Sequence, residues 1–115
     1  MYHFQALILL LFRGCVSEAA GLWETCFDSR ARVFPKAGAK LVLDNIKRTV
    51  EGAGFTMDEL TWVQIFTSDL AYYAAFNEVY RTYFKGPLPA RAFLGAGSLL
   101  GGAHFEVMGI AVKSK

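Results

Sequence analysis

The spacing of apolar residues changes along this chain between helix-type and strand-type periodicity, and this change restricts the fold more than any other feature. A first helix is predicted from Pro35, a residue that suits a first helical turn, to Gly52 and Gly54, which are typical of a helix end. Its apolar positions lie three or four residues apart and form one face: Ala39, Val42, Leu43, Ile46 and Val50.

Three strand-type segments and a second helix follow the first helix. Residues 60–67 (LTWVQIFT) are rich in β-branched and aromatic residues and predict a strand, and residues 90–95 and 104–112 predict two more. The second helix is expected between the strands 60–67 and 90–95, with Ser68 or Asp69 as its cap. That helix carries an aromatic stripe, which we interpret as core packing: Tyr73, Phe76, Tyr80 and Phe84.

The amino-terminal residues 6–12 (ALILLLF) form an apolar run that is too short to span a membrane. A signal peptide is the alternative, with small residues at 19–21 as its cleavage zone, but no Lys or Arg precedes the run. A buried strand is therefore favoured. Residues 13–35 are expected to be irregular, with a short strand near 22–27. Cys15 and Cys26 are expected to be reduced thiols without a structural disulfide.

These segments predict a single α+β domain over residues 1–115, with a mixed sheet and two helices on one face. The other sheet face remains apolar, and 54% of the residues are hydrophobic, so we expect a partner subunit to cover it. Lys plus Arg number 12 against 10 Asp plus Glu. This near balance lacks the electrostatic footprint of a nucleic-acid-binding or membrane-binding protein.

Glu106 stands out because it lies inside the apolar strand FEVMGIAV, where a carboxylate is costly unless it is exposed, paired or functional. Arg91 begins the preceding strand, and two antiparallel neighbours would bring the pair close. The two residues form either a structural ion pair or an anion site with an acid/base, and the pattern alone leaves both open. His3, His104 and the cysteines lack metal-ligand spacing, so no metal site is predicted.

From Leu43 onward, several segments match one known family in order and spacing. They are LDNIKRTVEGAG (43–54), DELTWVQIFTSDL (58–70), FNEVYRTYF (76–84), LPAR (88–91) and the closing HFEVMGIAV (104–112). Over residues 36–113 the chain resembles the RidA family, also called YjgF or L-PSP endoribonuclease, and residues 1–35 are divergent. The most specific pieces are Pro-Ala-Arg and the glutamate fifteen residues after that arginine.

The resemblance implies a sandwich like that of chorismate mutase, assembled as a homotrimer whose sheets form a central barrel, with sites in the clefts between subunits. It implies hydrolytic deamination of reactive enamines and imines, such as 2-aminoacrylate, to 2-oxo acids and ammonia, without metal or cofactor. The expected location is the cytoplasm, and neither a nucleic acid nor a membrane is an expected partner.

The resemblance also assigns roles to residues. Arg91 would bind the carboxylate of a small substrate, the backbone N–H of Phe93 would donate to the same carboxylate, and Glu106 would activate water as a general acid/base. Tyr2 and Arg13 are further candidates for the pocket. The chain departs from the family where Arg13-Gly14-Cys15 replaces Ser-Gly-Gln and where Met108 replaces a second carboxylate.

Two other functions remain open from the sequence. A non-catalytic trimer that binds a small carboxylate would need Arg91 and not Glu106. RNA cleavage is the weakest of the three hypotheses, because the near-neutral charge and the absence of a basic aromatic surface do not favour binding to RNA.

Overall fold

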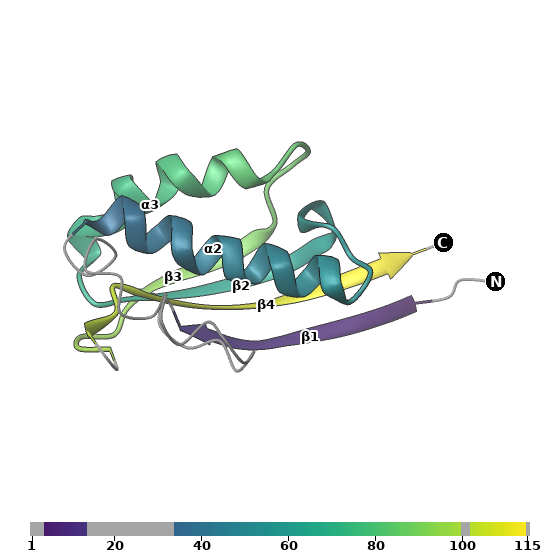
Figure 1. Cartoon of the computed structure of the whole chain (residues 1–115), viewed down its shortest axis with the longest axis horizontal. Coiled ribbons are helices and arrows are strands. Elements are labelled where there is room, and N and C mark those ends of the chain that lie inside the picture. The colour runs from purple at the N-terminus through teal and green to yellow at the C-terminus, as the bar shows by residue number, and fades with distance from the viewer. Residues whose placement is uncertain (1–3, 14–33, 100–101, 115) are drawn as a thin grey trace.

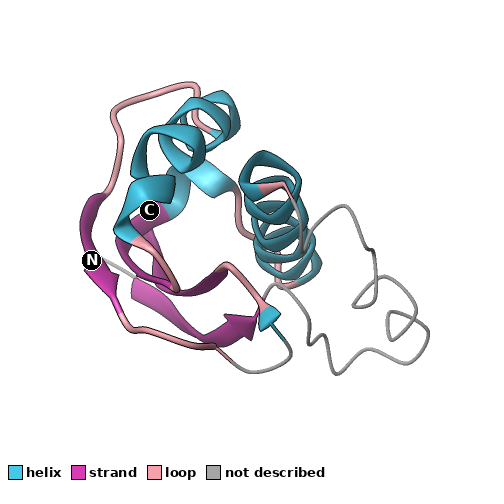
Figure 2. Ribbon diagram, turned by 90° about the vertical axis from the view of Figure 1, so that its left-hand side faces the viewer, coloured by secondary structure: helices cyan, strands magenta, loops and turns pink. Residues whose placement is uncertain are grey.

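The structure is a computed structural model that describes residues 4–13, 34–99 and 102–114. In this part of the chain, β1 (Phe4–Arg13), β2 (Leu60–Thr67), β3 (Ala90–Gly95) and β4 (Phe105–Ser114) form one sheet. Helices α2 (Pro35–Gly52) and α3 (Tyr73–Tyr80) both lie on one side of the curved sheet (Figures 1 and 2). Three short 3-10 turns complete the described elements: η2 (Met57–Glu59), η3 (Leu70–Tyr72) and η4 (Arg81–Tyr83). The predicted α+β sandwich is confirmed.

The strand order is β1-β4-β2-β3, which makes the sheet mixed. Strand β4 pairs antiparallel with β1 and β2, whereas β3 pairs parallel with β2. The expectation that the last two strands are antiparallel neighbours is therefore wrong, because β2 lies between them. The physical reason is the crossover through α3, which returns the chain beside β2 in the same direction.

Helix α2 forms as its periodicity predicts. Pro35 occupies its first turn, and the apolar face is buried against the sheet, with Val42 and Val50 each 0% exposed. The chain leaves the helix through Gly54, whose φ of 88° lies in the left-handed region that glycine adopts without strain. The predicted helix and its glycine end are therefore confirmed.

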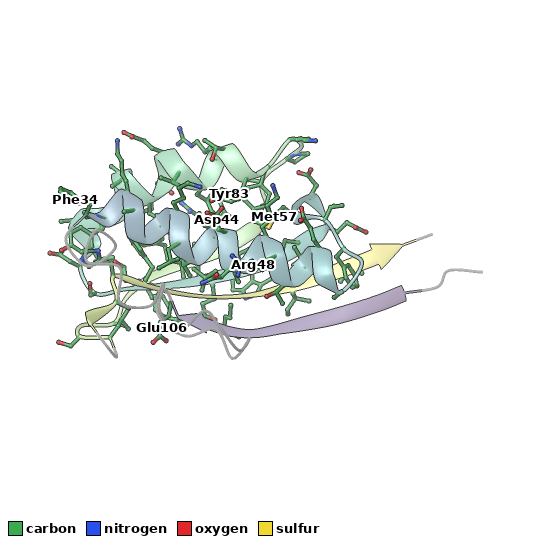
Figure 3. The ribbon with its side chains drawn as sticks, in the orientation of Figure 1. Phe34, Asp44, Arg48, Met57, Tyr83 and Glu106 are labelled. Carbon is green, nitrogen blue, oxygen red and sulfur yellow. The ribbon has the colours of Figure 1, made fainter. Side chains whose placement is uncertain are left out.

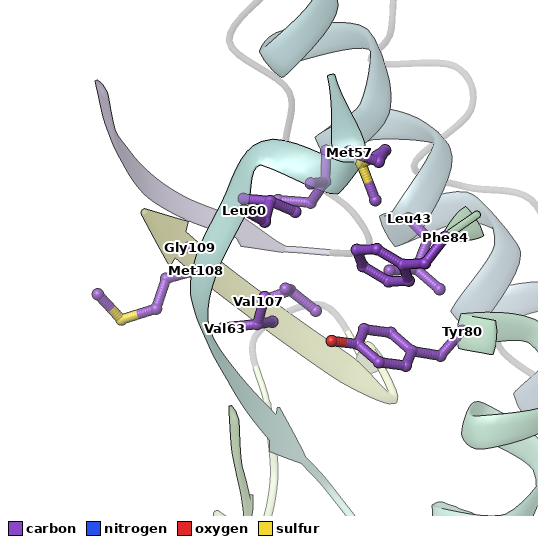
Figure 4. Close-up of a pocket in the computed structure, with 10 residues that line it drawn as sticks. Leu43, Met57, Leu60, Val63, Tyr80, Phe84, Val107, Met108 and Gly109 are labelled. Carbon is purple, nitrogen blue, oxygen red and sulfur yellow. The ribbon is translucent and has the colours of Figure 1, made fainter. Parts of the chain in front are cut away.

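The two faces of β4 alternate between the helix layer and the other side of the sheet. Phe105 and Val107 are each 1% exposed and face the helices, whereas Glu106 and Met108 are only partly buried and point to the other side. Figure 4 shows Met108 directed away from the apolar side chains that gather between the sheet and the helices. We call the side of the sheet without helices the open face; it carries Trp62, Gln64, Phe66, Glu106, Met108 and Ile110.

The aromatic stripe of α3 is buried only in part. Phe76 and Tyr80 are 0% and 1% exposed and belong to the core, and Phe84 packs against it. Tyr73, by contrast, is 49% exposed, so the interpretation of the whole stripe as core was wrong for this residue. Tyr73 is the first residue of α3, and its ring contacts Phe93 of β3. Strand β3 is the last strand of the sheet order, with no further described strand beside it.

The apolar run near the amino terminus is part of β1, which confirms the predicted strand. Tyr2, Cys15, Cys26 and the short strand predicted near 22–27 lie outside the described residues. No helix within the described ranges has the length and apolar character needed to cross a membrane.

Candidate anion-binding site

Strand β3 directs the side chain of Arg91 toward the helices. In the parallel register, Arg91 lies opposite Val63 of β2, a core residue that is 2% exposed and faces the helix layer. Paired positions share a face of a sheet. Arg91 therefore extends beneath α3 and becomes partly buried there.

Three aromatic rings surround the guanidinium group of Arg91. Its Cζ atom lies 4.8 Å from the ring centre of Tyr80, 5.6 Å from that of Tyr73 and 5.7 Å from that of Phe93. Cations are attracted electrostatically to the faces of such rings at these distances. The rings thus stabilise the positive charge without neutralising it.

The neutral side chain of Asn77 is a polar partner of Arg91. The Nη2 group of Arg91 donates a hydrogen bond of 2.5 Å to Oδ1 of Asn77, which is 9% exposed on α3. Within the described ranges, no carboxylate forms an ion pair with Arg91, and its buried Nη1 atom has no hydrogen-bond partner there. A partly buried cation with an unsatisfied donor is the arrangement expected of an anion site.

Tyr73 is the exposed member of this group. Hydrogen bonding from Asn77 and then from Arg91, together with the positive charge of Arg91, lowers the pKa of the Tyr73 hydroxyl. These partners favour the phenolate, so the positive charge of Arg91 acts on the Tyr73 hydroxyl as well. We call Tyr73, Asn77, Tyr80, Arg91 and Phe93 the Arg91 cluster.

The backbone of β3 offers further donors beside this cluster. The N–H of Ala96 donates to the carbonyl oxygen of Thr67 in β2, at 2.8 Å. Because successive N–H groups of a strand point to opposite sides, those of Arg91, Phe93 and Gly95 face away from β2. The backbone N–H predicted for carboxylate binding, that of Phe93, thus lies along the outer edge of β3.

Glu106 leaves the sheet from the open face, opposite to Arg91. Glu106 is partly buried, and its neighbours along β4, Phe105 and Val107, point to the helices. Figure 3 shows the side chain of Glu106 on the far side of the sheet from α2 and α3. In the backbone register, Arg13 of β1 lies opposite Glu106. The described part of the chain therefore brings Arg91 and Phe93 together but does not bring Glu106 to them.

Sequence reasoning missed Asn77 and Tyr73. The sequence pattern assigns no role to Asn77, and the interpretation of the aromatic stripe as core packing includes Tyr73. A usable signal was their spacing, since residues four apart share a helix face. What the pattern could not supply was the parallel placement of β3 beneath that face. No group of three or more His, Cys, Asp or Glu that could hold a metal occurs among the residues described.

An α+β sandwich with a partly buried arginine on strand β3 defines the general class of this protein, and comparison with known proteins defines its family. Residues 28–113 match the family model described as Endoribonuclease L-PSP. The chain belongs to this family, whose solved members include RidA and YjgF.

Three solved structures illustrate the similarity. A protein from Aeropyrum pernix is 45% identical over 68% of this chain and 67% of its own, with a TM-score of 0.65. RidA from the Antarctic bacterium Psychrobacter sp. is 33% identical over 66% of this chain and 62% of its own, with a TM-score of 0.64. TdcF from E. coli, crystallised with bound serine, is 30% identical over 68% of this chain and 64% of its own, with a TM-score of 0.66. This chain spans 61% of the length of a further relative, from Thermotoga maritima.

Proposed function

We propose that this protein is a hydrolytic deaminase that converts reactive enamine or imine intermediates, of the 2-aminoacrylate type, to 2-oxo acids and ammonia. The observation that carries the proposal is the Arg91 guanidinium, which is partly buried among aromatic rings and has no carboxylate partner among the described residues. Such a group suits a small substrate that carries a carboxylate. The serine bound to the relative TdcF has a carboxylate of this size.

In the proposed reaction, Arg91 and the backbone N–H of Phe93 bind the substrate carboxylate and orient the adjacent C=N carbon. Glu106 accepts a proton from water as the water oxygen forms a bond to that carbon, which gives a carbinolamine. That proton passes to nitrogen as the C=N electron pair moves there, which completes the neutral carbinolamine. The hydroxyl proton of the carbinolamine then passes through Glu106 to the same nitrogen, C=O forms as the C–N bond breaks, and ammonia and the 2-oxo acid leave. An enamine substrate first becomes the imine by moving a proton from nitrogen to carbon. Water supplies the oxygen, so the reaction balances without a metal, a cofactor or an oxidant.

We also propose that the protein acts as a homotrimer whose sites lie between subunits. Arg91 and Glu106 project from opposite faces of one sheet, so a single subunit is poorly suited to place both beside one small substrate. A cleft that combines Arg91 of one subunit with Glu106 of a neighbour removes this difficulty. The apolar open face, with Trp62 36% exposed, provides a surface for such contacts. We place this activity in the cytoplasm.

A second function is favoured by one specific observation. The Arg91 cluster is complete within one subunit, whereas Glu106 lies on the other face. A non-catalytic homotrimer that binds small carboxylates would use Arg91 and leave Glu106 without a chemical role.

The deciding experiment generates 2-aminoacrylate in situ with a pyridoxal-phosphate enzyme and follows the release of pyruvate with and without this protein. Faster release supports the deaminase. Unchanged release, together with tight binding of pyruvate or serine, supports the binding protein instead.

Arg91→Ala is expected to lower kcat/KM by about 2–5 kcal/mol of transition-state stabilisation, because it removes one partner of a desolvated charge pair. Lys47→Gln, an exposed change of the same charge on α2, serves as the control.

A further inference from the structure

We propose that Asn77 is a positioning residue that holds the Arg91 guanidinium ready for an anion and leaves its charge uncompensated. This inference rests on the proposed role of Arg91 in binding the substrate carboxylate, and it adds a residue to which neither the sequence pattern nor the comparisons assign a function. Asn77 does not itself need to touch the substrate.

The geometry fixes the guanidinium from two directions. The ring of Tyr80 lies 4.8 Å from Cζ of Arg91, and the carbonyl oxygen of Asn77 accepts from Nη2 at 2.5 Å. Asn77 comes from α3 and Arg91 from β3, so the contact also depends on the packing of helix against strand. Together these contacts leave Nη1 as the buried donor without a described partner.

The neutral amide at position 77 is the feature that carries the argument. A carboxylate there would hold the guanidinium equally well, and a hydrogen bond between charged groups would be stronger. It would also cancel the positive charge and compete with an incoming anion. An amide oxygen positions the group and leaves its full charge for the ligand.

Asn77→Asp tests this idea, because the variant keeps the shape and the acceptor oxygen and adds one negative charge beside Arg91. We expect pyruvate, measured by titration calorimetry, to bind at least about tenfold more weakly to this variant, while its melting temperature is unchanged or higher. Lys47→Gln removes one positive charge at an exposed site of α2 and is expected to leave binding unchanged. An unchanged affinity in Asn77→Asp would overturn the proposal, even if the protein proves to be a deaminase.

A second measurement separates this proposal from the proposed function. In the wild-type protein labelled with ¹⁵N-arginine, the fixed guanidinium of Arg91 should give separate Nη resonances. In Asn77→Ala, or in Asn77→Ser if the alanine variant unfolds, these resonances should merge as rotation becomes free. Merging supports the positioning role whether or not substrate is turned over. Separate Nη resonances in the folded variants would refute the positioning role of Asn77. A wild-type protein that neither binds nor converts the substrate would refute the proposed function alone.

Discussion

Arg91 shows at the scale of one residue how a partly buried cation is retained without an acidic partner among the described residues. Burial disfavours a charge, and the usual compensation is an ion pair. Here the compensation comes from aromatic faces and from the Asn77 amide, each of which is uncharged. Neither partner neutralises the guanidinium, so its charge can attract an anion.

Glu106 is the residue whose chemistry distinguishes the two proposed functions. Glu106→Gln preserves the size of the side chain and its partial burial but removes the proton acceptor. If Glu106 is the general base, kcat should fall on the order of 10²–10⁴-fold with KM little changed. Steady-state kinetics with 2-aminoacrylate measures both parameters. Met108→Leu, on the same face of β4, is the control, and a Glu106→Gln enzyme with wild-type kcat would contradict the assigned role.

Tyr80 carries a buried hydroxyl without a hydrogen-bond partner among the described residues, and Figure 4 shows this hydroxyl directed toward the strands that carry Val63 and Val107. Burial raises its pKa to about 12. A raised pKa means that the fold prefers the neutral phenol. The stability that Tyr80 contributes is thus fully present below pH 10.0, the ordinary value, and is lost as the pH rises toward about 12.

Tyr80→Phe should therefore leave stability unchanged at neutral pH, or raise it by about 1 kcal/mol, because it removes an unsatisfied buried group and keeps the ring beneath Arg91. It should also reduce the fall in melting temperature above pH 10.0. Thermal unfolding followed by circular dichroism at neutral and alkaline pH measures both effects. Tyr73→Phe should not reduce the loss of stability at alkaline pH, because the pKa of Tyr73 is shifted down, opposite to that of Tyr80. A marked loss of stability at neutral pH in Tyr80→Phe would show that the hydroxyl has a partner.

At the scale of elements, local patterns predicted the segments and missed how two of them meet. The ranges of β2 and β3 follow directly from residue type, and α2 from its three- and four-residue spacing. The position of β3 beside β2 depends on a crossover connection and on pairing between residues far apart in the chain, which periodicity does not encode. For this reason the sequence identified Arg91 and Glu106 as candidates but could not place them on opposite faces.

The turn that leads into β3 depends on one carboxylate of η2. Asp58 accepts hydrogen bonds from the backbone N–H groups of Lys85 at 3.0 Å and Gly86 at 3.1 Å. Asp58→Ala should lower the free energy of unfolding by about 1–2 kcal/mol, since two backbone donors lose a charged acceptor. Urea unfolding measures the change. Glu51→Ala, an exposed change on α2, should have little effect, and equal losses in the two variants would contradict the role of Asp58 in this turn.

Helices α2 and α3 are joined at their exposed edges as well as through the core. Lys36 of α2 forms an ion pair with Glu78 of α3, which lowers the pKa of that carboxyl. The Tyr83 hydroxyl donates to Asp44 at 2.5 Å, and Figure 3 shows these two side chains meeting between the helical segments. Burial and the Asp44 carboxylate raise the pKa of Tyr83. These contacts fix α3 above β3 and so support the contact of Asn77 with Arg91.

At the scale of the whole molecule, the open face of the sheet indicates assembly. The described helices cover one face, and the other carries Trp62, Phe66, Met108 and Ile110, none of which is fully buried among the described residues. We expect a homotrimer, and light scattering at micromolar concentration should give three times the chain mass of 12.7 kDa. Met108→Lys should weaken assembly because it places a charge in that contact. A monomeric mass for the wild-type protein would exclude the proposed clefts between subunits.

The opposite orientation of Arg91 and Glu106 leads to the most specific test of the assembly. Arg91→Ala and Glu106→Gln are each expected to retain at most about a few per cent of wild-type activity as pure trimers. If every site combines Arg91 of one subunit with Glu106 of its neighbour, then trimers formed from both variants contain some clefts with two intact residues. Random assembly of equal amounts should restore about one quarter of wild-type activity in the unfractionated mixture, because each residue of a cleft is intact in half of the cases. Trimers that contain both variants should have about one third of wild-type activity, because one of their three clefts is intact.

The two variants are co-expressed with different affinity tags, and mixed trimers are isolated through both tags before activity is measured. A site built within one subunit would give no recovery, since each subunit then lacks one of the two residues. Recovery must also disappear when both substitutions are placed in the same chain and that chain is mixed with either single variant, because no cleft of such a mixture has both residues intact. This result would locate the proposed chemistry between subunits by a measurement that is independent of the geometry of one chain.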